Sequence, residues 1–337
     1  MNSLNADNRS GTESPALAAP AGVVPQPRKW PAVVAALVVS MLLPLQSWLN
    51  GELGHRVGDG TAAAALSLAA GWVAVTPFAL LIPRQRRAWR TLATAVKERQ
   101  FPRYCLLAGA CGSVLVFVQS TAALVTGIAV FTVSVIAGQT LGGLVVDALG
   151  IARSPRRGLG AARLIGAVLV VAAAVISVFP RLVDAPHPVT VLLPALGAVT
   201  AGFMLSLQKA MNGATAAAAR SPLLATWVSF FVATAIPLLV WGARHLAGGG
   251  SVHLPTQIWL YFGGLVGAVF IAVAALVVRH IGVLLLSMAS VAGQLVGSIA
   301  LDVFFPLGGA LSVLPTATGA CLTLIAIAIA TKGRNSR

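Results

Sequence analysis

Two short stretches, LPLQSWLNG and LSLQKAMNG, place polar side chains inside long apolar runs. They share the pattern Gln-x-x-x-Asn-Gly, with Gln46 and Asn50 in the first and Gln208 and Asn212 in the second. Residues four apart lie on one face of a helix, so each stretch presents two amides side by side. Amides donate and accept hydrogen bonds without carrying a charge. We therefore predict that these four residues bind a polar, weakly charged substrate.

Four further polar residues lie in similar apolar surroundings. Gln139 and Gln294 lie near the middle of their apolar runs, and Ser67 and Ser229 lie within theirs. We predict that they contribute hydrogen bonds to the same substrate-binding site. The alternative is structural: the glutamines would join neighbouring helices, at about 0.6 kcal/mol each, and the serines would bond to their own helix backbone.

Two carboxylates, Asp147 and Asp302, also fall within apolar runs. A carboxylate at bilayer depth costs about 2.5–3.5 kcal/mol on insertion scales. Both lie near the C-terminal end of their predicted helix, where the helix dipole disfavours an anion. We predict a coupling or gating role for them, at opposite mouths of one pathway. The alternative is a structural pair, Asp147 with Arg153 or Arg156 and Asp302 with the N-terminus of a facing helix.

The composition indicates the environment of these groups. Hydrophobic residues make up 58% of the chain and charged residues 9%, and the mean hydropathy is +0.90, whereas soluble domains carry roughly 25% charged residues. We therefore predict an all-α integral membrane protein, since a chain in lipid must satisfy its backbone hydrogen bonds internally. The net charge of +15 comes from basic residues in the gaps between apolar runs. This pattern is typical of membrane proteins and argues against nucleic-acid binding.

Other kinds of chemistry have no counterpart in the sequence. The three cysteines and five histidines show no metal-ligand spacing, and there is no P-loop that would bind a nucleotide. We therefore predict no catalytic residue, no metal and no cofactor.

Apolar runs of about 20 residues, the length of a membrane-spanning helix, occur ten times. The predicted spans are 31–50, 61–82, 104–122, 127–149, 160–179, 189–211, 222–241, 256–277, 281–304 and 312–331. Residues 1–30 would form a disordered cytoplasmic tail, and residues 332–337 a short cytoplasmic tail at the other end. With both termini inside, 20 of the 23 Lys and Arg residues lie on the cytoplasmic side, Lys209 and Arg220 among them, in agreement with the positive-inside rule.

The chain also contains an internal repeat. The residues that recur after 162 positions are Gln46, Asn50, Gly51 and Ser67, and those that recur after 155 are Gly109, Gly112, Gly127, Gly138, Gln139, Gly142 and Asp147. The two repeats, 31–182 and 189–331, each hold five predicted spans, an odd number, so the second enters the membrane from the opposite side. Inverted topology of this kind predicts a shared site near the membrane midplane, between the halves.

The elements LQ-x3-NG, AGQTLGGLVVD (137–147) and AGQLVGSIALD (292–302) resemble the YdcZ-type inner-membrane transporters of the drug/metabolite transporter superfamily. The resemblance covers about residues 31–331, and the chain looks like two five-helix units of that family joined together. It implies a bundle of ten helices that works by alternating access in the bacterial cytoplasmic membrane. The related small multidrug exporters carry a Glu in their first helix. Here the first span has Gln46 and Asn50 but no acid, which argues against proton-coupled export of lipophilic cations.

These features predict a secondary active transporter, an exporter of a small polar metabolite or xenobiotic, and not an enzyme. One alternative is a non-transporting membrane scaffold or sensor, which gives no reason for the inverted duplication. Another is a membrane-embedded enzyme acting on lipid-linked substrates, which would need a clustered acid/base or metal group. The predicted partners are the substrate and the lipid bilayer. Coupling to protons or sodium, and a monomeric or homodimeric state, are left open.

Overall fold

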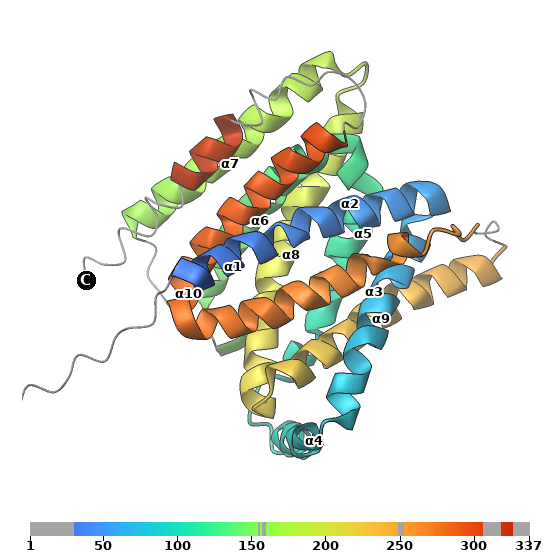
Figure 1. Cartoon of the computed structure of the whole chain (residues 1–337), viewed down its shortest axis with the longest axis vertical. Helices are drawn as coiled ribbons and strands as arrows, with labels where there is room; N and C mark the ends of the chain where they lie inside the picture. Colours follow the sequence, from blue (N-terminus) through green and yellow to red (C-terminus); the bar gives the residue numbers. More distant parts are fainter. Residues whose placement is uncertain (1–29, 154–155, 157–159, 249–252, 306–317, 326–337) are drawn as a thin grey trace, which may run out of the picture.

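The computed structural model describes residues 30–153, 156, 160–248, 253–305 and 318–325. The regular structure in these residues is helical (Figure 1). The α-helices are α1 (Trp30–Ser40), α2 (Leu42–Val57), α3 (Gly60–Leu81), α4 (Pro83–Lys97), α5 (Ala108–Thr126), α6 (Ile128–Leu149), α7 (Ala161–Asp184), α8 (Val189–Ala219), α9 (Pro222–Leu246) and α10 (Gly263–Phe304). Short 3-10 turns are η1 (Arg103–Leu107), η2 (Ile151–Arg153) and η3 (Ile258–Phe262).

Several of these helices are long and apolar enough to cross a membrane. In the described part of the chain there are seven such segments: Trp30–Val57, Gly60–Leu81, Arg103–Thr126, Ile128–Leu149, Arg163–Asp184, Val189–Ala219 and Pro222–Leu246. Two shorter apolar helices are Ile258–Ile271 and Met288–Phe304. The predicted all-α, multi-span character of the chain is therefore confirmed.

The helices that carry the Gln-x-x-x-Asn-Gly pattern are longer than predicted. The spans 31–50 and 189–211 should end at the pattern, but α2 continues to Val57 and α8 to Ala219. Glycine after an apolar run commonly ends a helix, yet Gly51 packs inside α2: an added Cβ atom would lie 2.9 Å from Cγ of Leu124 in α5. The paired amides consequently lie in the interior of their helices, about two turns before the end.

The predicted cytoplasmic loop after the second span contains a helix, α4. Proline at its first position favours helix initiation, and its buried residues, Gln85, Ala88, Leu92 and Ala95, recur on one face. The arginines of α4 lie on the exposed face. Gln85 accepts a hydrogen bond from the hydroxyl of Ser221 (2.7 Å), which joins α4 to the start of α9.

The last three predicted spans have a different outcome. The spans 256–277 and 281–304 lie largely in one helical run, α10, which Figure 1 shows as two legs joined by a sharp bend. Of the span 312–331, residues 318–325 are described; they are helical and lie beside α7 (Figure 1). Residues 1–29 and 332–337, which make up nearly all of the two predicted tails, lie outside the described residues.

Helix α6 packs along α8, and α10 packs along α1, through direct backbone contact. An added Cβ atom would lie 1.8 Å from the backbone oxygen of Val199 at Gly138, and 2.2 Å from that of Leu37 at Gly293. Gly293 follows Gly138 by 155 residues, and Val199 follows Leu37 by 162. The same close contact therefore occurs twice, at positions related by the sequence repeat.

A second pair of contacts obeys the same relation. In α5, an added Cβ atom at Gly109 would lie 2.0 Å from the backbone oxygen of Ser229 in α9. In α10, an added Cβ atom at Gly264 would lie 1.9 Å from the backbone oxygen of Ser67 in α3. Each of these contacts joins a residue of the first half to one of the second half, so the two halves are packed into one body.

The helix ends around the paired amides also correspond. The C-cap residues of α2 and α8 are Gly58 and Arg220, both in the left-handed conformation, with φ of 73° and 52°. The next residue then caps the following helix: the Asp59 carboxylate caps α3 and the Ser221 hydroxyl caps α9. Such side-chain caps satisfy backbone N–H groups that a helix leaves unpaired at its start. The local structure that positions the amides is therefore built in the same way in both halves.

Candidate substrate-binding site

A buried cluster of polar side chains lies between α2, α3 and α5. Asn50 donates from Nδ2 to Oε1 of Gln119 (2.8 Å) and accepts at Oδ1 from the hydroxyl of Ser67 (2.6 Å). Gln119 in turn donates from Nε2 to Oγ of Ser47 (2.9 Å). Asn50 and Ser67 are fully buried, and Gln119 is 4% exposed. Because both amides use their oxygen and their nitrogen, the cluster is held in one arrangement and has little capacity left for a ligand.

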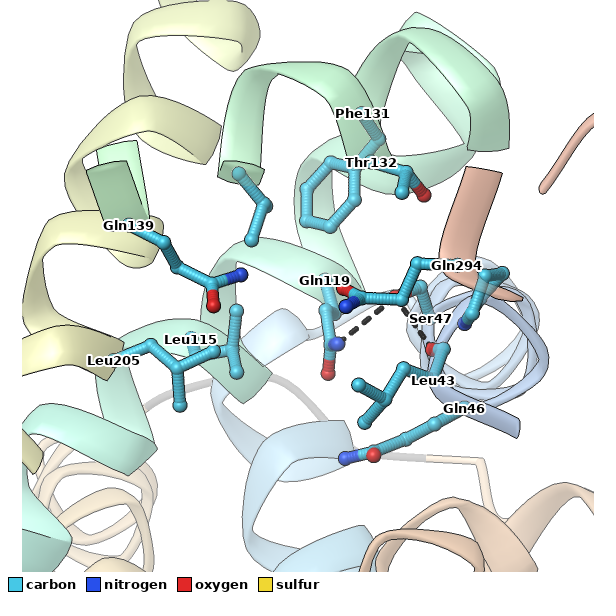
Figure 2. A pocket seen from close by; sticks show the side chains of 12 residues that line it. Leu43, Gln46, Ser47, Leu115, Gln119, Phe131, Thr132, Gln139, Leu205 and Gln294 are labelled. Atoms are coloured by element: carbon cyan, nitrogen blue, oxygen red, sulfur yellow. Dashed lines mark hydrogen bonds between the residues drawn. The ribbon is translucent and has the colours of Figure 1, made fainter. Parts of the chain in front are cut away.

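Next to this cluster lies a small cavity, of about 30 Å³ (Figure 2). Its polar lining residues are Gln46, Ser47, Gln119, Thr132, Gln139 and Gln294, and its apolar ones are Leu43, Pro44, Leu115, Phe131, Val135 and Leu205. Figure 2 shows Gln139 on one side of the cavity and Gln46 and Gln294 on the other. A volume of this size holds a few water molecules at most. A metabolite could therefore enter only if the surrounding helices moved apart.

Two glutamines of the cavity have hydrogen-bonding groups to spare. Gln46 is 8% exposed and has no hydrogen-bond partner among the described residues. Gln294 is 7% exposed, and its Nε2 donates to the backbone oxygen of Ser290 in its own helix (3.1 Å). The spare amide atoms of Gln46 and Gln294 are not fully enclosed by protein, so water or a ligand in the cavity can reach them. These amides are thus the groups in the cavity that a polar ligand would satisfy.

The second Gln-x-x-x-Asn-Gly pattern forms a looser cluster beside α9. The side-chain nitrogens of Gln208 and Asn212 both approach Oγ of Ser229, at 3.2 and 3.3 Å. The residue between them, Lys209, donates from Nζ to Oε1 of Gln139 (2.7 Å), which lines the cavity. Lys209 therefore connects this cluster to the cavity.

The two clusters differ in burial although their residues correspond. Asn50 is fully buried, whereas its counterpart Asn212 is half-buried. Gly51 is buried, whereas its counterpart Gly213 is exposed and has open space where a Cβ atom would lie. The first cluster is closed by neighbouring helices and the second is accessible from the side on which α8 ends.

Asp302 is held by the start of a helix. Its two carboxylate oxygens accept hydrogen bonds from the backbone N–H groups of Ile128 and Ala129, both at 3.0 Å. These residues begin α6, so the negative charge lies at the positive end of the helix dipole. The Arg181 guanidinium lies close by, 2.3 Å from where a Cβ atom of Gly127 would be. This geometry is that of the structural alternative for Asp302.

Asp147 forms an ion pair with Arg163 at the start of α7. Both side chains are partly exposed, at 25% and 22%. The partner considered from the sequence was Arg153 or Arg156, but Arg163 is closer because α7 runs back along α6. Arg153 instead reaches the backbone oxygen of Gln100.

The predicted site residues are thus distributed over three connected places. Gln46, Gln139 and Gln294 line the cavity, Asn50 and Ser67 belong to the closed cluster, and Gln208, Asn212 and Ser229 form the open one.

Sequence reasoning does not identify Gln119 or Lys209. The position equivalent to Gln119 in the second half is Ala274, so a search for recurring polar residues passes over it. Lys209 lies near the end of the predicted span 189–211 and is counted there with the cytoplasmic cations. A signal does exist for Gln119, which is a lone amide in an apolar run just as Gln139 is.

A comparison with known protein families is consistent with these features. The family model described as "Putative inner membrane exporter, YdcZ" matches the chain twice, over residues 31–176 and 193–329. The two matched segments lie within the two repeats defined from the sequence. A search of curated proteins found no match.

Proposed function

Because this chain belongs to the YdcZ family of inner-membrane exporters, we propose that it is a secondary active transporter that exports a small polar solute by alternating access. The family description concerns transport and not catalysis, and the chain has many helices long enough to cross a membrane. The proposal concerns what is moved and how the two halves move it.

The observation that carries the proposal is the cavity and its unsatisfied amides. Gln46 and Gln139 come from the first half of the chain and Gln294 from the second, and all three line one space. Amides suit hydroxyl, carbonyl or amide groups of a solute, because they both donate and accept. The cavity is too small for such a solute in this conformation, so binding requires the helices around it to separate.

The paired contacts between the halves support an inverted repeat of two five-helix units, residues 31–182 and 189–331. Gly138 with Val199 corresponds to Gly293 with Leu37, as a two-fold relation between the units requires. Inverted repeats allow two packings of similar energy that open to opposite sides of the membrane. The closed cluster around Asn50 and the open cluster of the second half fit one of these two states.

With both termini in the cytoplasm, the open cluster would face the cytoplasm, since α8 would end there beside the basic helix α4. The proposed cycle then begins with solute binding from the cytoplasm. Closure around the Asn212 side and opening around the Asn50 side would release the solute outside. In this scheme Asp147 and Asp302 hold helices together, because both carboxylates already have internal partners.

The orientation is tested by cysteine labelling in a chain from which Cys105, Cys111 and Cys321 have been removed. Thr94→Cys lies on the exposed side of α4, and His187→Cys lies in the exposed connection between α7 and α8. In intact cells, an impermeant thiol reagent should label the His187 variant only. Labelling of the Thr94 variant from outside would contradict the proposed orientation.

Transport is tested with purified protein and a panel of metabolites and xenobiotics. Solutes that raise the melting temperature bind the native state and should then exchange across proteoliposome membranes. Gln46→Leu and Gln294→Leu should abolish both effects without lowering the melting temperature of the unliganded protein, because neither amide joins two helices in the described structure. Thr200→Val is the matched control, since the Thr200 hydroxyl is exposed and bonds only to its own helix.

Unchanged binding and exchange in both leucine variants would show that the cavity is not the transport site. Turnover of a panel member by the protein, without exchange, would favour the enzyme alternative instead.

A further inference from the structure

Lys209 is a cation deep within a membrane-spanning helix. It lies ten residues before the end of α8 at Ala219, or about 15 Å at the helical rise of 1.5 Å per residue. Helix α8 has 31 residues and is about 46 Å long, whereas the hydrocarbon core of a bilayer is about 30 Å thick. Lys209 is five residues from the middle of α8 and therefore lies within the length of helix that crosses the core. A charged residue at this depth is costly and usually has a functional role.

The Lys209 side chain is exposed overall, but its ammonium group reaches the cavity wall at the side chain of Gln139. Gly202 and Leu205 lie on the same face of α8, seven and four residues before it. Gly202 packs against α6, and Leu205 lines the cavity. Nζ of Lys209, on the same face of α8, donates a hydrogen bond to Oε1 of Gln139, which is part of the cavity wall.

The charge of Lys209 has no counter-charge among the described residues. The three ion pairs there are Arg56 with Glu52, Arg163 with Asp147 and Arg244 with Asp59. The ammonium group has three N–H donors, and Gln139 is its one hydrogen-bond partner in the described structure. Two donors and the positive charge of Lys209 therefore remain unpaired beside Gln139, across the cavity from the amides of Gln46 and Gln294 (Figure 2).

This charge is specific to one half of the chain. The residue equivalent to Lys209 in the first half is Ser47, which accepts a hydrogen bond from Gln119 inside the closed cluster. A structural role shared by the two halves would call for the same residue type in both. Lys209 instead adds a single positive charge to the accessible cluster.

We propose that Lys209 anchors the solute and that the solute is a small monocarboxylate bearing hydroxyl or amide groups. This inference rests on the proposed transport function and specifies its substrate class. One lysine balances the single charge of a carboxylate. A phosphate monoester carries nearly two negative charges, and a lysine that binds phosphate usually acts together with further donors such as arginine, a metal or a helix N-terminus. The cavity glutamines would bind the hydroxyl or amide groups, and the carboxylate would supply the missing counter-charge. A solute that is neutral or cationic would leave Lys209 unpaired.

The first test measures melting temperature in nanodiscs with pairs of solutes that differ only in charge: lactate against lactamide, and glycerate against glyceramide. Glycerol 3-phosphate is included to distinguish phosphate from carboxylate. The carboxylates should stabilise the wild-type protein and the neutral amides should not. In Lys209→Gln the apparent affinity for the carboxylate should fall by about tenfold to a hundredfold, the usual effect of losing a charged hydrogen bond. Lys209→Arg should retain part of the binding, and Lys97→Gln, at the exposed end of α4, should bind as the wild type does.

The melting temperature of unliganded Lys209→Met separates a binding role from a structural one. Removing an unpaired charge from the membrane should leave this temperature unchanged or raise it. A fall would mean that Lys209 supports the fold, and would contradict the inference.

The second test asks whether water and solute reach this position. Lys209→Cys, in the cysteine-free chain, should react with an impermeant thiol reagent in inside-out vesicles. The labelling is done without added lactate or glycerate. Failure to react from either side would contradict the inference. Stabilisation by the neutral amides lactamide and glyceramide, or by glycerol 3-phosphate, and not by the carboxylates would contradict it as well. In that last case the transport function would stand and the monocarboxylate class would be wrong. Stabilisation by no carboxylate in the panel would also overturn the inference.

Discussion

Replacing Asp302 by alanine tests whether this carboxylate holds α6 in place. The change removes the acceptor of two backbone hydrogen bonds, from Ile128 and Ala129, each 3.0 Å long. An unsatisfied buried donor costs about 1–3 kcal/mol, and water can reach part of this site because Asp302 is only half-buried. We therefore expect a loss of roughly 2–4 kcal/mol in the free energy of unfolding. The nearby Arg181 cation adds to the loss, since it would then face the positive end of the helix dipole alone.

The assay is thermal unfolding of purified protein in detergent, followed by tryptophan fluorescence. A change of 1 kcal/mol moves the melting temperature of a protein of this size class by about 2 °C, so Asp302→Ala should melt roughly 4–8 °C below the wild type. Asp302→Asn keeps one oxygen as an acceptor and should lose about half as much. Asp184→Ala is the matched control, because Asp184 is an exposed carboxylate at the end of α7.

Melting of Asp302→Ala within about 1 °C of the wild type would refute the structural role. If Asp302→Asn also kept full stability but abolished the pH dependence of transport, the carboxylate would be a coupling group, and the hydrogen bonds to α6 would be incidental to its function.

Two further predictions follow from the repeated contacts. Gly109→Ala and Gly264→Ala should each lower the melting temperature or the yield of folded protein, because the added methyl would lie about 2 Å from a backbone oxygen and overpacking costs about 1–3 kcal/mol or more. Gly213→Ala is the control and should have little effect, since the space around Gly213 is open. Equal behaviour of all three variants would contradict the close packing. Asn50→Ala should destabilise the protein by more than Asn212→Ala, as measured by unfolding in detergent. Asn50 is fully buried with two short hydrogen bonds, whereas Asn212 is half-buried with one long hydrogen bond. Equal losses of stability would mean that the two clusters are equally closed.

Patterning along the sequence predicts much of this fold. Long apolar runs predict helices in a membrane, and the recurrence of Gln46 and Asn50 as Gln208 and Asn212 predicts which helices correspond. Helix ends are less predictable, because Gly51 and Gly213 could either end a helix or allow close packing inside it. For α4, the apolar residues Ala88, Leu92 and Ala95 do recur at helical spacing, but five basic residues between Pro83 and Lys97 favour the interpretation as a loop.

The chemistry of the site is only partly visible in the sequence, because it depends on which partners meet in space. Nothing near Asn50 in the chain indicates Gln119, which lies 69 residues away in sequence and 2.8 Å away in the structure. Nor does the sequence distinguish a lysine at the membrane surface from one that faces a cavity, since this depends on how far α8 continues beyond Lys209. Asp302 shows the same limit: its partner is a helix start 174 residues earlier.

The contacts between the halves have a consequence for how the protein is made. Leu37 in α1 packs against Gly293 in α10. Because these residues lie far apart in the sequence, α1 leaves the ribosome long before its packing partner has been synthesised. At about 5–20 residues per second, synthesis of the intervening chain takes roughly 10–50 s. During this time the helices of the first half wait in the membrane with the faces that later contact α8, α9 and α10 uncovered. We therefore expect the nascent chain to depend on insertion factors that shield polar groups in lipid, and truncation after the first repeat to yield a fragment that is rapidly degraded.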